Sequence, residues 1–339
     1  MAEPGEEAGG AGPEAPARGG GRLAAIGGGT GLSALLRGLK HHVGGERLRE
    51  LTGVVTVTDD GGSSGRLRRD FGVPAPGDIR SCLVALADDE DLLTRLFQYR
   101  FPNGGGLFGH SFGNLFLTAL TGITGDFHQA ILTAESILSV RGKICPATLQ
   151  DVRLRGRGAS GRIYEGESAI GDSGEAIDRL ELDPPAPPAF PAAAMALEHA
   201  DLILLGPGSL YTSILPNLLI PGIRQAVAKS PAQTLLLLNL MTQPGETDGM
   251  TGLDHLGAVE RFAGHGLVDA VLVNSAEIPD DLLAYYAETG SEPVRIDRGE
   301  VEAQGTMVFE ADLLAEGDLL IRHDPQKLAR AVMDLLDHA

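Results

Sequence analysis

The sequence predicts a Rossmann-like α/β sandwich of three layers, with a mainly parallel sheet and a small β-containing insertion. Short apolar segments alternate with amphipathic helical segments along most of the 339 residues. Such alternation is typical of a parallel sheet covered by helices on both faces. Several apolar segments end in glycine-rich loops, where open α/β sheets bind ligands. Between about residues 141 and 191 the alternation gives way to a polar, proline-rich stretch, which predicts the insertion.

The elements follow from composition and periodicity. Residues 1–22 contain mainly Gly, Ala, Pro and Glu, which predicts a disordered tail, and residues 23–339 are expected to form one domain. The expected strands are Leu23 to Ile26, Leu51 to Val57, Leu202 to Leu205, Thr234 to Leu238 and Ala270 to Val273. Helices are expected from Leu32, from Ile79, and from Asp126 to Val140. Within the insertion, Ala147 to Leu154 and Gly161 to Glu167 are expected to pair as a hairpin.

The first glycine-rich loop joins the first expected strand to the first helix. Its glycines let a ligand approach the backbone without interference from a Cβ atom. Thr30 is expected to cap the helix that begins near Leu32, whose amide groups favour a phosphate. The dinucleotide fingerprint G-x-G-x-x-G is not met, so a tight turn without a ligand remains the alternative. The candidate ligand contacts in this loop are Gly27, Gly28, Gly29, Thr30 and Gly31.

Carboxylates follow the second expected strand. Asp59 and Asp60 precede the sequence GGSSG, and Asp78 follows in the sequence PGD. Adjacent side chains at a strand end point to opposite sides, so we expect one to face the crevice and the other to brace the loop. Oxygen ligands suit Mg²⁺ or a ribose hydroxyl, and Asp60 and Asp78 are the candidate Mg²⁺ ligands. The alternative is a solvated acidic turn in which Asp78 caps a helix.

Three further loops are expected to border the same crevice. The second of them repeats the pattern of a strand that ends in glycines and hydroxyl groups, which suits a phosphate, although a plain turn is the alternative. His110 is more often structural than catalytic in such a setting, because the sequence identifies no carboxylate partner for it. The candidate contacts in these loops are His110, Ser111 and Asn114; Gly206, Gly208, Ser209 and Tyr211; and Asn239, Thr242 and Gln243.

Composition limits the function classes. The formal charge of −19 opposes the phosphates of nucleic acids, so DNA and RNA are not expected as partners. The N-terminus lacks the features of a signal peptide and no apolar run approaches a membrane span, which predicts a cytoplasmic protein without membrane contact. Cys82 and Cys145 are expected to be reduced packing residues. An anionic ligand would be held locally by backbone amides and by Arg66, Arg68, Arg69 and Arg80.

No catalytic residue is assigned from these patterns. The sequence contains no nucleophile elbow, zinc-ligand spacing or P-loop. It therefore predicts a nucleotide or nucleotide-sugar site more firmly than it predicts a reaction.

Six blocks in order along the chain resemble one family. They are GGGTGLSALLRGLK, TVTDDGGSSGRLRRDFG, PGDIRSCLVAL, FGHSFGNL, GPGSLYTSILPNLL and NLMTQPGET. Together they are similar to the YvcK proteins, or gluconeogenesis factors, which belong to the CofD-like group and are related to the 2-phospho-L-lactate transferase of deazaflavin cofactor synthesis. The resemblance runs from about Arg22 to the C-terminus.

This resemblance implies a cytoplasmic regulatory protein that binds a UDP-sugar such as UDP-N-acetylglucosamine. It also implies a role in cell shape and envelope precursor supply during growth on gluconeogenic carbon, a protein partner in amino-sugar metabolism, and a homo-oligomer. Tyr286 and Arg322 fall where family members contact the UDP-sugar, whereas the alternatives place Tyr286 in the core and Arg322 at the cap of the last helix. The second functional reading is a Mg²⁺-dependent, CofD-like phospholactate transferase. The loop TDDGGSSG is longer than in the transferases, so enzyme activity is left open.

Overall fold

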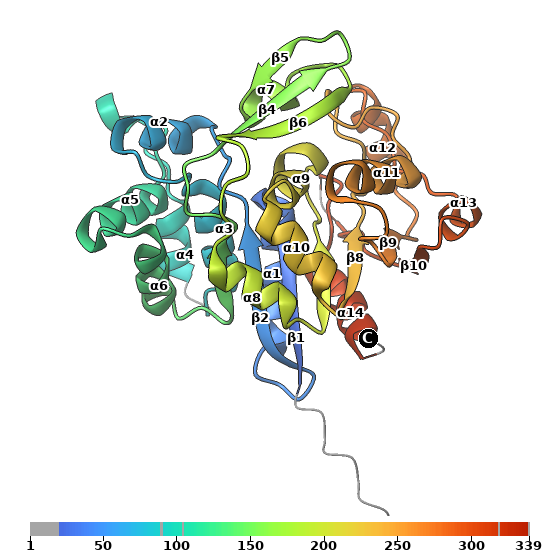
Figure 1. Ribbon diagram of the computed structural model, residues 1–339, viewed down its shortest axis with the longest axis horizontal. Helices are drawn as coiled ribbons and strands as arrows, with labels where there is room; N and C mark the ends of the chain where they lie inside the picture. The colour runs from blue at the N-terminus through green and yellow to red at the C-terminus, as the bar shows by residue number, and fades with distance from the viewer. Residues whose placement is uncertain (1–19, 89–90, 104, 318, 338–339) are drawn as a thin grey trace, which may run out of the picture.

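The computed structural model describes residues 20–88, 91–103, 105–317 and 319–337. It contains a seven-stranded sheet in the order β10-β9-β8-β7-β1-β2-β3 and a separate three-stranded sheet in the order β5-β4-β6 (Figure 1). All strand pairs of the large sheet are parallel, whereas those of the small sheet are antiparallel. The predicted α/β class and the β-containing insertion are confirmed.

The large sheet includes two strands that the sequence analysis did not predict, β3 and β10. Its strands are β1 (Gly21–Gly27), β2 (Leu48–Val55), β3 (Lys143–Pro146), β7 (Leu202–Leu205), β8 (Gln233–Leu237), β9 (Ala270–Asn274) and β10 (Met307–Ala311). β1 begins two residues earlier than predicted, because Gly21 and Arg22 pair with β2. The predicted tail otherwise falls on residues 1–19, which lie outside the described residues. β2 also begins earlier and ends earlier than the predicted span Leu51 to Val57.

Helices cover both faces of this sheet, and successive strand residues belong to different cores. Leu23 and Ala25 of β1 pack in one core, whereas Ala24 and Ile26 pack in the other. Burial on both faces explains why these strands are apolar without interruption. One core is lined by α1 (Gly29–Leu39), α3 (Gly77–Leu86), α5 (Phe112–Thr124), α6 (Phe127–Leu138) and α14 (Pro325–Leu336). The other is lined by α8 (Pro191–Glu198), α9 (Leu215–Leu218), α10 (Pro221–Lys229), α11 (Gly252–Ala263) and α13 (Arg298–Glu302).

The strand order reverses next to β1. The chain runs from β1 to β2 and β3 on one side, and then returns to β7 on the other side. The carboxyl ends of β1 and β7 therefore form a switch point, where open α/β sheets place their ligands. The remaining helices are α2 (Gly62–Phe71), α4 (Asp91–Gln98), α7 (Glu167–Gly171) and α12 (Asp280–Ala287).

The insertion lies over the carboxyl ends of the strands, at the top of Figure 1. It comprises β4 (Arg153–Gly158), β5 (Ile163–Glu165), α7 and β6 (Ile177–Asp183). The predicted hairpin corresponds to β4 and β5, although its first strand begins at Arg153 and not at Ala147. The N–H of Ala147 donates to the carbonyl of Val55, so this part of the chain still extends the large sheet. β6 was not predicted.

Replacement of Gly31 tests the contact between the loops after β1 and β7. A Cβ atom at Gly31 would collide with the backbone of Pro207 and come within 2.8 Å of the Gly208 Cα atom. Because backbone must move to make room, we expect Gly31→Ala to lower the free energy of unfolding by about 1 to 3 kcal/mol in urea denaturation. Gly257→Ala is the matched control, because no atom lies within 4 Å of its Cβ position. The control is expected to be neutral or stabilising by up to about 1 kcal/mol, and equal losses in both variants would contradict a tight loop contact.

Candidate functional site

Two glycine-rich loops meet at the switch point between β1 and β7. Backbone atoms of the two loops approach closely, since a Cβ atom at Gly208 would lie 3.6 Å from the carbonyl oxygen of Gly28. Gly29 and Gly206 have φ angles of 58° and 84°, which favour glycine. The amide Nδ2 of Asn217 donates to the carbonyl of Gly27 over 3.3 Å and so fixes the carboxyl end of β1. The sequence prediction that these strand ends lie together is consistent with this geometry.

Helix α1 begins at the first loop without a side-chain cap. Its N-cap is Gly28, and Thr30 lies inside the first turn, where its carbonyl accepts a hydrogen bond from the Ser33 hydroxyl over 3.0 Å. The predictions that Thr30 caps the helix and that the helix begins near Leu32 are therefore wrong. The positive φ of Gly29 allows the helix to start three residues earlier. The N–H of Gly29 donates to the carboxylate of Asp78, so one amide of the helix N-terminus already has an anionic partner.

Asp59 and Asp60 point in different directions, as expected for neighbours at a strand end. The Asp59 carboxylate accepts the Gly61 N–H over 2.9 Å and lies beside Gly77 at the start of α3. The Asp60 Oδ1 atom accepts the N–H and the hydroxyl of Ser168, each over 3.2 Å. Asp60 thus braces the loop against the insertion, whereas Asp59 lies near Asp78.

A fourth carboxylate, Glu167, comes from the insertion and was not predicted. It is half-buried at the start of α7 and accepts a hydrogen bond from the Thr58 hydroxyl. Burial and the negative charge of Asp78 raise the pKa of Glu167 well above its ordinary value. Burial and the Asp59 carboxylate likewise raise the pKa of Asp78 to about 7. No sequence motif marks Glu167, because its proximity depends on how the insertion folds over β2.

The carboxylates are chemically suited to a divalent cation. Carboxylate and hydroxyl oxygens are the ligands that Mg²⁺ prefers, and a cation would relieve the repulsion that raises these pKa values. Among the described residues, however, no three His, Cys, Asp or Glu side chains already have an arrangement that could hold a metal ion. Mg²⁺ at Asp60 and Asp78 therefore stays a prediction. The alternative role of Asp78 as a helix cap is wrong, since the N-cap of α3 is Pro76.

The loop after β8 holds the loop after β7 in place. The side-chain amide of Asn239 donates to the Gly208 carbonyl over 2.9 Å and accepts its N–H over 3.2 Å. The buried carboxylate of Glu246 accepts hydrogen bonds from the Ser209 hydroxyl and from the Tyr211 N–H. Burial raises the pKa of Glu246, and these donors oppose that rise. Asn239 and Glu246 thus fix the conformation of the loop after β7 through hydrogen bonds from the loop after β8.

Other predicted residues of these loops also have partners within the protein. Thr242 is 2% exposed and exchanges hydrogen bonds with the backbone of Glu292. Gln243 lies close enough for its Oε1 atom to accept the Asn239 amide over 3.5 Å. The Tyr211 ring is 5% exposed and packs edge-on against Phe262. Their ligand contacts stay predictions.

The block around His110 forms a buried network behind the carboxylates. His110 Nδ1 lies 2.9 Å from the Ser63 hydroxyl, and both side chains are buried. Ser111 caps α5 by accepting the Asn114 N–H over 3.2 Å. The Asn114 Oδ1 atom accepts a hydrogen bond from Arg80 over 2.9 Å. The network ties α5 to α2 and α3, and its contact with a ligand stays a prediction.

Arg68 acts as a structural clamp. Its side chain is buried, and its guanidinium donates to the Asp151 carboxylate and to the carbonyls of Val152 and Thr58. These bonds join the β2 loop to the strand that enters the insertion. The guanidinium nitrogens of Arg68 all have partners within the protein, and its contact with an anionic ligand stays a prediction. Arg66 similarly donates to the carbonyls of Gly62 and Phe108.

Tyr286 and Arg322 are neighbours at the β9 and β10 side of the sheet. The Tyr286 hydroxyl accepts the Ile321 N–H over 3.1 Å, which places the α12 side chain against the segment that carries Arg322. Tyr286 is half-buried and Arg322 is exposed. The alternative placed Arg322 with its neighbours His323 and Asp324 at the start of the last helix, and of these Asp324 is the N-cap of α14, accepting the Gln326 and Lys327 N–H groups over 2.8 Å. The ligand roles of Tyr286 and Arg322 stay predictions.

Comparison with known proteins gives concordant results. The profile of a family described as 2-phospho-L-lactate transferase CofD matches residues 23–314. A gluconeogenesis factor of Bacillus subtilis is 47% identical over 93% of this chain and 98% of its own length. A gluconeogenesis factor of Halalkalibacterium halodurans is 46% identical over 91% of this chain and 94% of its own length. A crystal structure of a Bacillus halodurans protein superposes with a TM-score of 0.88 at 45% identity, covering 93% of this chain and 99% of that protein.

Among the helices of the described residues, none combines the length and the apolar character needed to cross a membrane.

The raised pKa of Asp78 predicts that stability depends on pH. Between about pH 4 and its folded-state pKa of about 7, Asp78 is ionised in the unfolded chain but still protonated in the folded one. The free energy of unfolding should therefore fall as the pH rises through this window, by at most about 4 kcal/mol from this group. Asp78→Asn should remove part of that fall and raise the melting temperature at pH 8, measured with EDTA present.

Asp70→Asn is the control for this experiment, because Asp70 is an exposed acid on α2. Its pH profile should follow that of the wild type. If the stability of Asp78→Asn also followed the wild-type pH dependence, ionisation of Asp78 would not destabilise the folded protein.

Proposed function

Because this chain belongs to the gluconeogenesis factor group of the CofD family, we propose that it binds a UDP-sugar at the carboxyl ends of β1 and β7. UDP-N-acetylglucosamine is the expected ligand. The observation that carries the proposal is the contact of two glycine-rich loops at the switch point, beside a helix α1 whose N-terminus has no side-chain cap. Backbone amides at such an N-terminus favour a phosphate group.

The carboxylates define how a diphosphate would be accommodated. Asp78 already accepts the Gly29 N–H, so a diphosphate at the start of α1 would lie next to a carboxyl group. Repulsion between the two is relieved when a divalent cation lies between them. We therefore propose Asp60 and Asp78 as the candidate ligands of Mg²⁺. Glu167 interacts electrostatically with both carboxylates, so the charge of the cation would also act on Glu167. Mg²⁺ would supply charge neutralisation for the diphosphate.

The other end of the ligand is assigned to Tyr286 and Arg322. The Tyr286 hydroxyl is engaged by the Ile321 N–H, so the ring face is the part of this side chain left for stacking on a base or sugar. Arg322 is exposed, and a guanidinium group forms charge-assisted bonds with a diphosphate.

A regulatory role without turnover is favoured by the relatives that match over nearly their whole length, which are named gluconeogenesis factors. Ser63 and His110 form a pair of a hydroxyl and a histidine, and these side chains are only 3% and 6% exposed. A nucleophile needs access to its substrate, which these two lack in this state. We therefore propose a cytoplasmic UDP-sugar sensor, linked to cell shape and envelope precursor supply on gluconeogenic carbon.

A Mg²⁺-dependent transferase is the second candidate. The match to the profile of the 2-phospho-L-lactate transferase family and the cluster of carboxylates favour it. A reaction of this kind needs a nucleotide donor, an acceptor and a cation, but no side-chain nucleophile.

The first test is the affinity for UDP-N-acetylglucosamine, measured by calorimetric titration with Mg²⁺ present. Tyr286→Ala and Arg322→Ala should each weaken binding roughly ten- to hundredfold, because each removes a contact of about 1 to 3 kcal/mol. Tyr285→Ala and Arg330→Ala are matched controls, since Tyr285 is 57% exposed on the same helix and Arg330 is exposed on α14. Wild-type affinity in both Tyr286→Ala and Arg322→Ala would place the ligand elsewhere.

The second test separates sensing from transfer. Labelled UDP-N-acetylglucosamine is incubated with the protein, Mg²⁺ and phosphorylated or hydroxylated acceptors, and the nucleotide products are separated by chromatography. A sensor should return the ligand intact after many binding lifetimes. Release of a free nucleotide that stops in EDTA and in Asp78→Asn would instead establish the transferase.

A further inference from the structure

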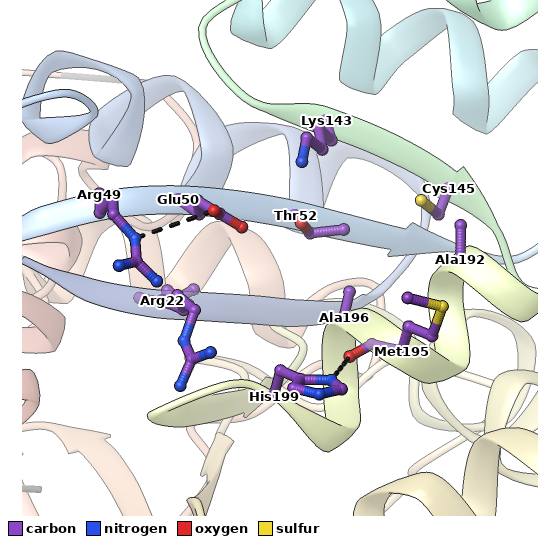
Figure 2. A pocket seen from close by; sticks show the side chains of 11 residues that line it. Arg22, Arg49, Glu50, Thr52, Lys143, Cys145, Ala192, Met195, Ala196 and His199 are labelled. Atoms are coloured by element: carbon purple, nitrogen blue, oxygen red, sulfur yellow. Dashed lines mark hydrogen bonds and ion pairs between the residues drawn. The ribbon is translucent and has the colours of Figure 1, made fainter.

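We propose that this protein has a second binding pocket, for small organic anions, at the amino ends of β1, β2 and β3. The pocket has a volume of about 360 Å³. Figure 2 shows its side chains, which come from three strands and from α8. We call it the amino-end pocket, and its residues that carry the argument are Arg22, Arg49, Thr52, Lys143, Met195 and His199.

The fold creates this pocket where helices leave part of the sheet uncovered. Arg22, Thr52 and Lys143 lie on the same face of the sheet as the second core, two residues before Ala24, Val54 and Cys145, which belong to it. The register places Thr52 beside Lys143 and Arg22 beside Glu50, so the floor of the pocket is a row of neighbouring side chains. Helix α8 forms one wall through Ala192, Met195 and Ala196.

The charges in the amino-end pocket differ from those of the whole chain. The protein has a formal charge of −19, yet this pocket contains Arg22, Arg49 and Lys143 against the single acid Glu50. Asp201 neutralises Arg22 through bonds of 3.2 Å, and Glu50 lies 3.8 Å from Arg49. Lys143 is exposed and has no ion pair with any residue that the structure describes. Glu135, outside the pocket, interacts electrostatically with Lys143, but the side chains that line the pocket carry more positive than negative charge, which favours a phosphate or carboxylate group.

Neutral groups in the pocket suit the remainder of such a molecule. Thr52 is only 5% exposed, and its hydroxyl group has no hydrogen-bond partner among the described residues. His199 Nδ1 lies 2.8 Å from the Met195 carbonyl and must donate to it, which leaves Nε2 for another partner. The Met195 side chain is 59% exposed and provides an apolar surface. A small metabolite with an anionic head group and a hydroxylated or aliphatic body would complement this set.

This inference does not rest on the proposed function. None of the residues that carry it belongs to the proposed site at the carboxyl ends of β1 and β7, because β1 places Arg22 at its amino end and the glycine loop at its carboxyl end. A ligand in the amino-end pocket should therefore bind whether or not a UDP-sugar does.

The test measures binding of glycerol 3-phosphate and of succinate by calorimetric titration of the whole protein. These probes distinguish a phosphate from a carboxylate head group. At least one should bind, and Lys143→Ala should weaken that binding tenfold or more. Lys229→Ala is the matched control, because it removes the same charge from an exposed position on α10 and should change affinity less than twofold.

A steric variant and a competition experiment complete the design. Ala196→Phe should abolish probe binding, because the larger ring fills the pocket without changing its charge. UDP-N-acetylglucosamine should not displace the probe. The proposal is overturned if neither probe binds, if Lys143→Ala binds like the wild type, or if UDP-N-acetylglucosamine competes, which would assign the probe to the other site. Failure of UDP-N-acetylglucosamine itself to bind would contradict only the proposed function.

Discussion

The close approach of the loops after β1 and β7 is the constraint on which the rest of the proposed site depends. A side chain at Gly31 would meet the backbone of Pro207, so the two loops can approach only because glycine occupies this position. Each loop is then held from a different direction. Asn217 fixes the carbonyl of Gly27 at the end of β1, whereas Asn239 binds both backbone groups of Gly208. The backbone atoms at the carboxyl ends of β1 and β7 are thus held in place by the side-chain amides of Asn217 and Asn239.

The insertion completes the proposed site by binding both of its sides. Ser168 donates to Asp60 after β2, and the Ser173 hydroxyl donates to the Gly245 carbonyl over 3.1 Å in the loop after β8. Between these two anchors, Glu167 joins the carboxylates of the large sheet. Groups of like charge therefore come together from separate segments, which is unfavourable unless protons or cations accompany them. Such an arrangement is typical of a site built for a charged ligand, since structural networks usually pair opposite charges.

Local sequence patterns predicted the centre of the fold better than its edges. Strands β1, β7, β8 and β9 were recognised because they are apolar on both faces, and the loops that follow them were recognised by glycine, hydroxyl and carboxylate residues. β3 was missed because its four residues are too short to show a period, and β10 because its exposed positions dilute the apolar signal. The roles of Glu167 and Arg68 could not be predicted, because each depends on a partner about a hundred residues away, Thr58 for Glu167 and Asp151 with Val152 for Arg68, and no local pattern encodes such a pair.

β1 connects the two ends of the molecule, and its pairing limits how they can influence each other. It forms parallel ladders with β2 on one edge and with β7 on the other. A movement of β1 along its own axis would break the hydrogen bonds of both ladders at once. The two ladders therefore exclude sliding of β1 as a route by which one end of the strand could affect the other. If both proposed sites bind their ligands, a sliding movement of β1 would therefore not link the two affinities.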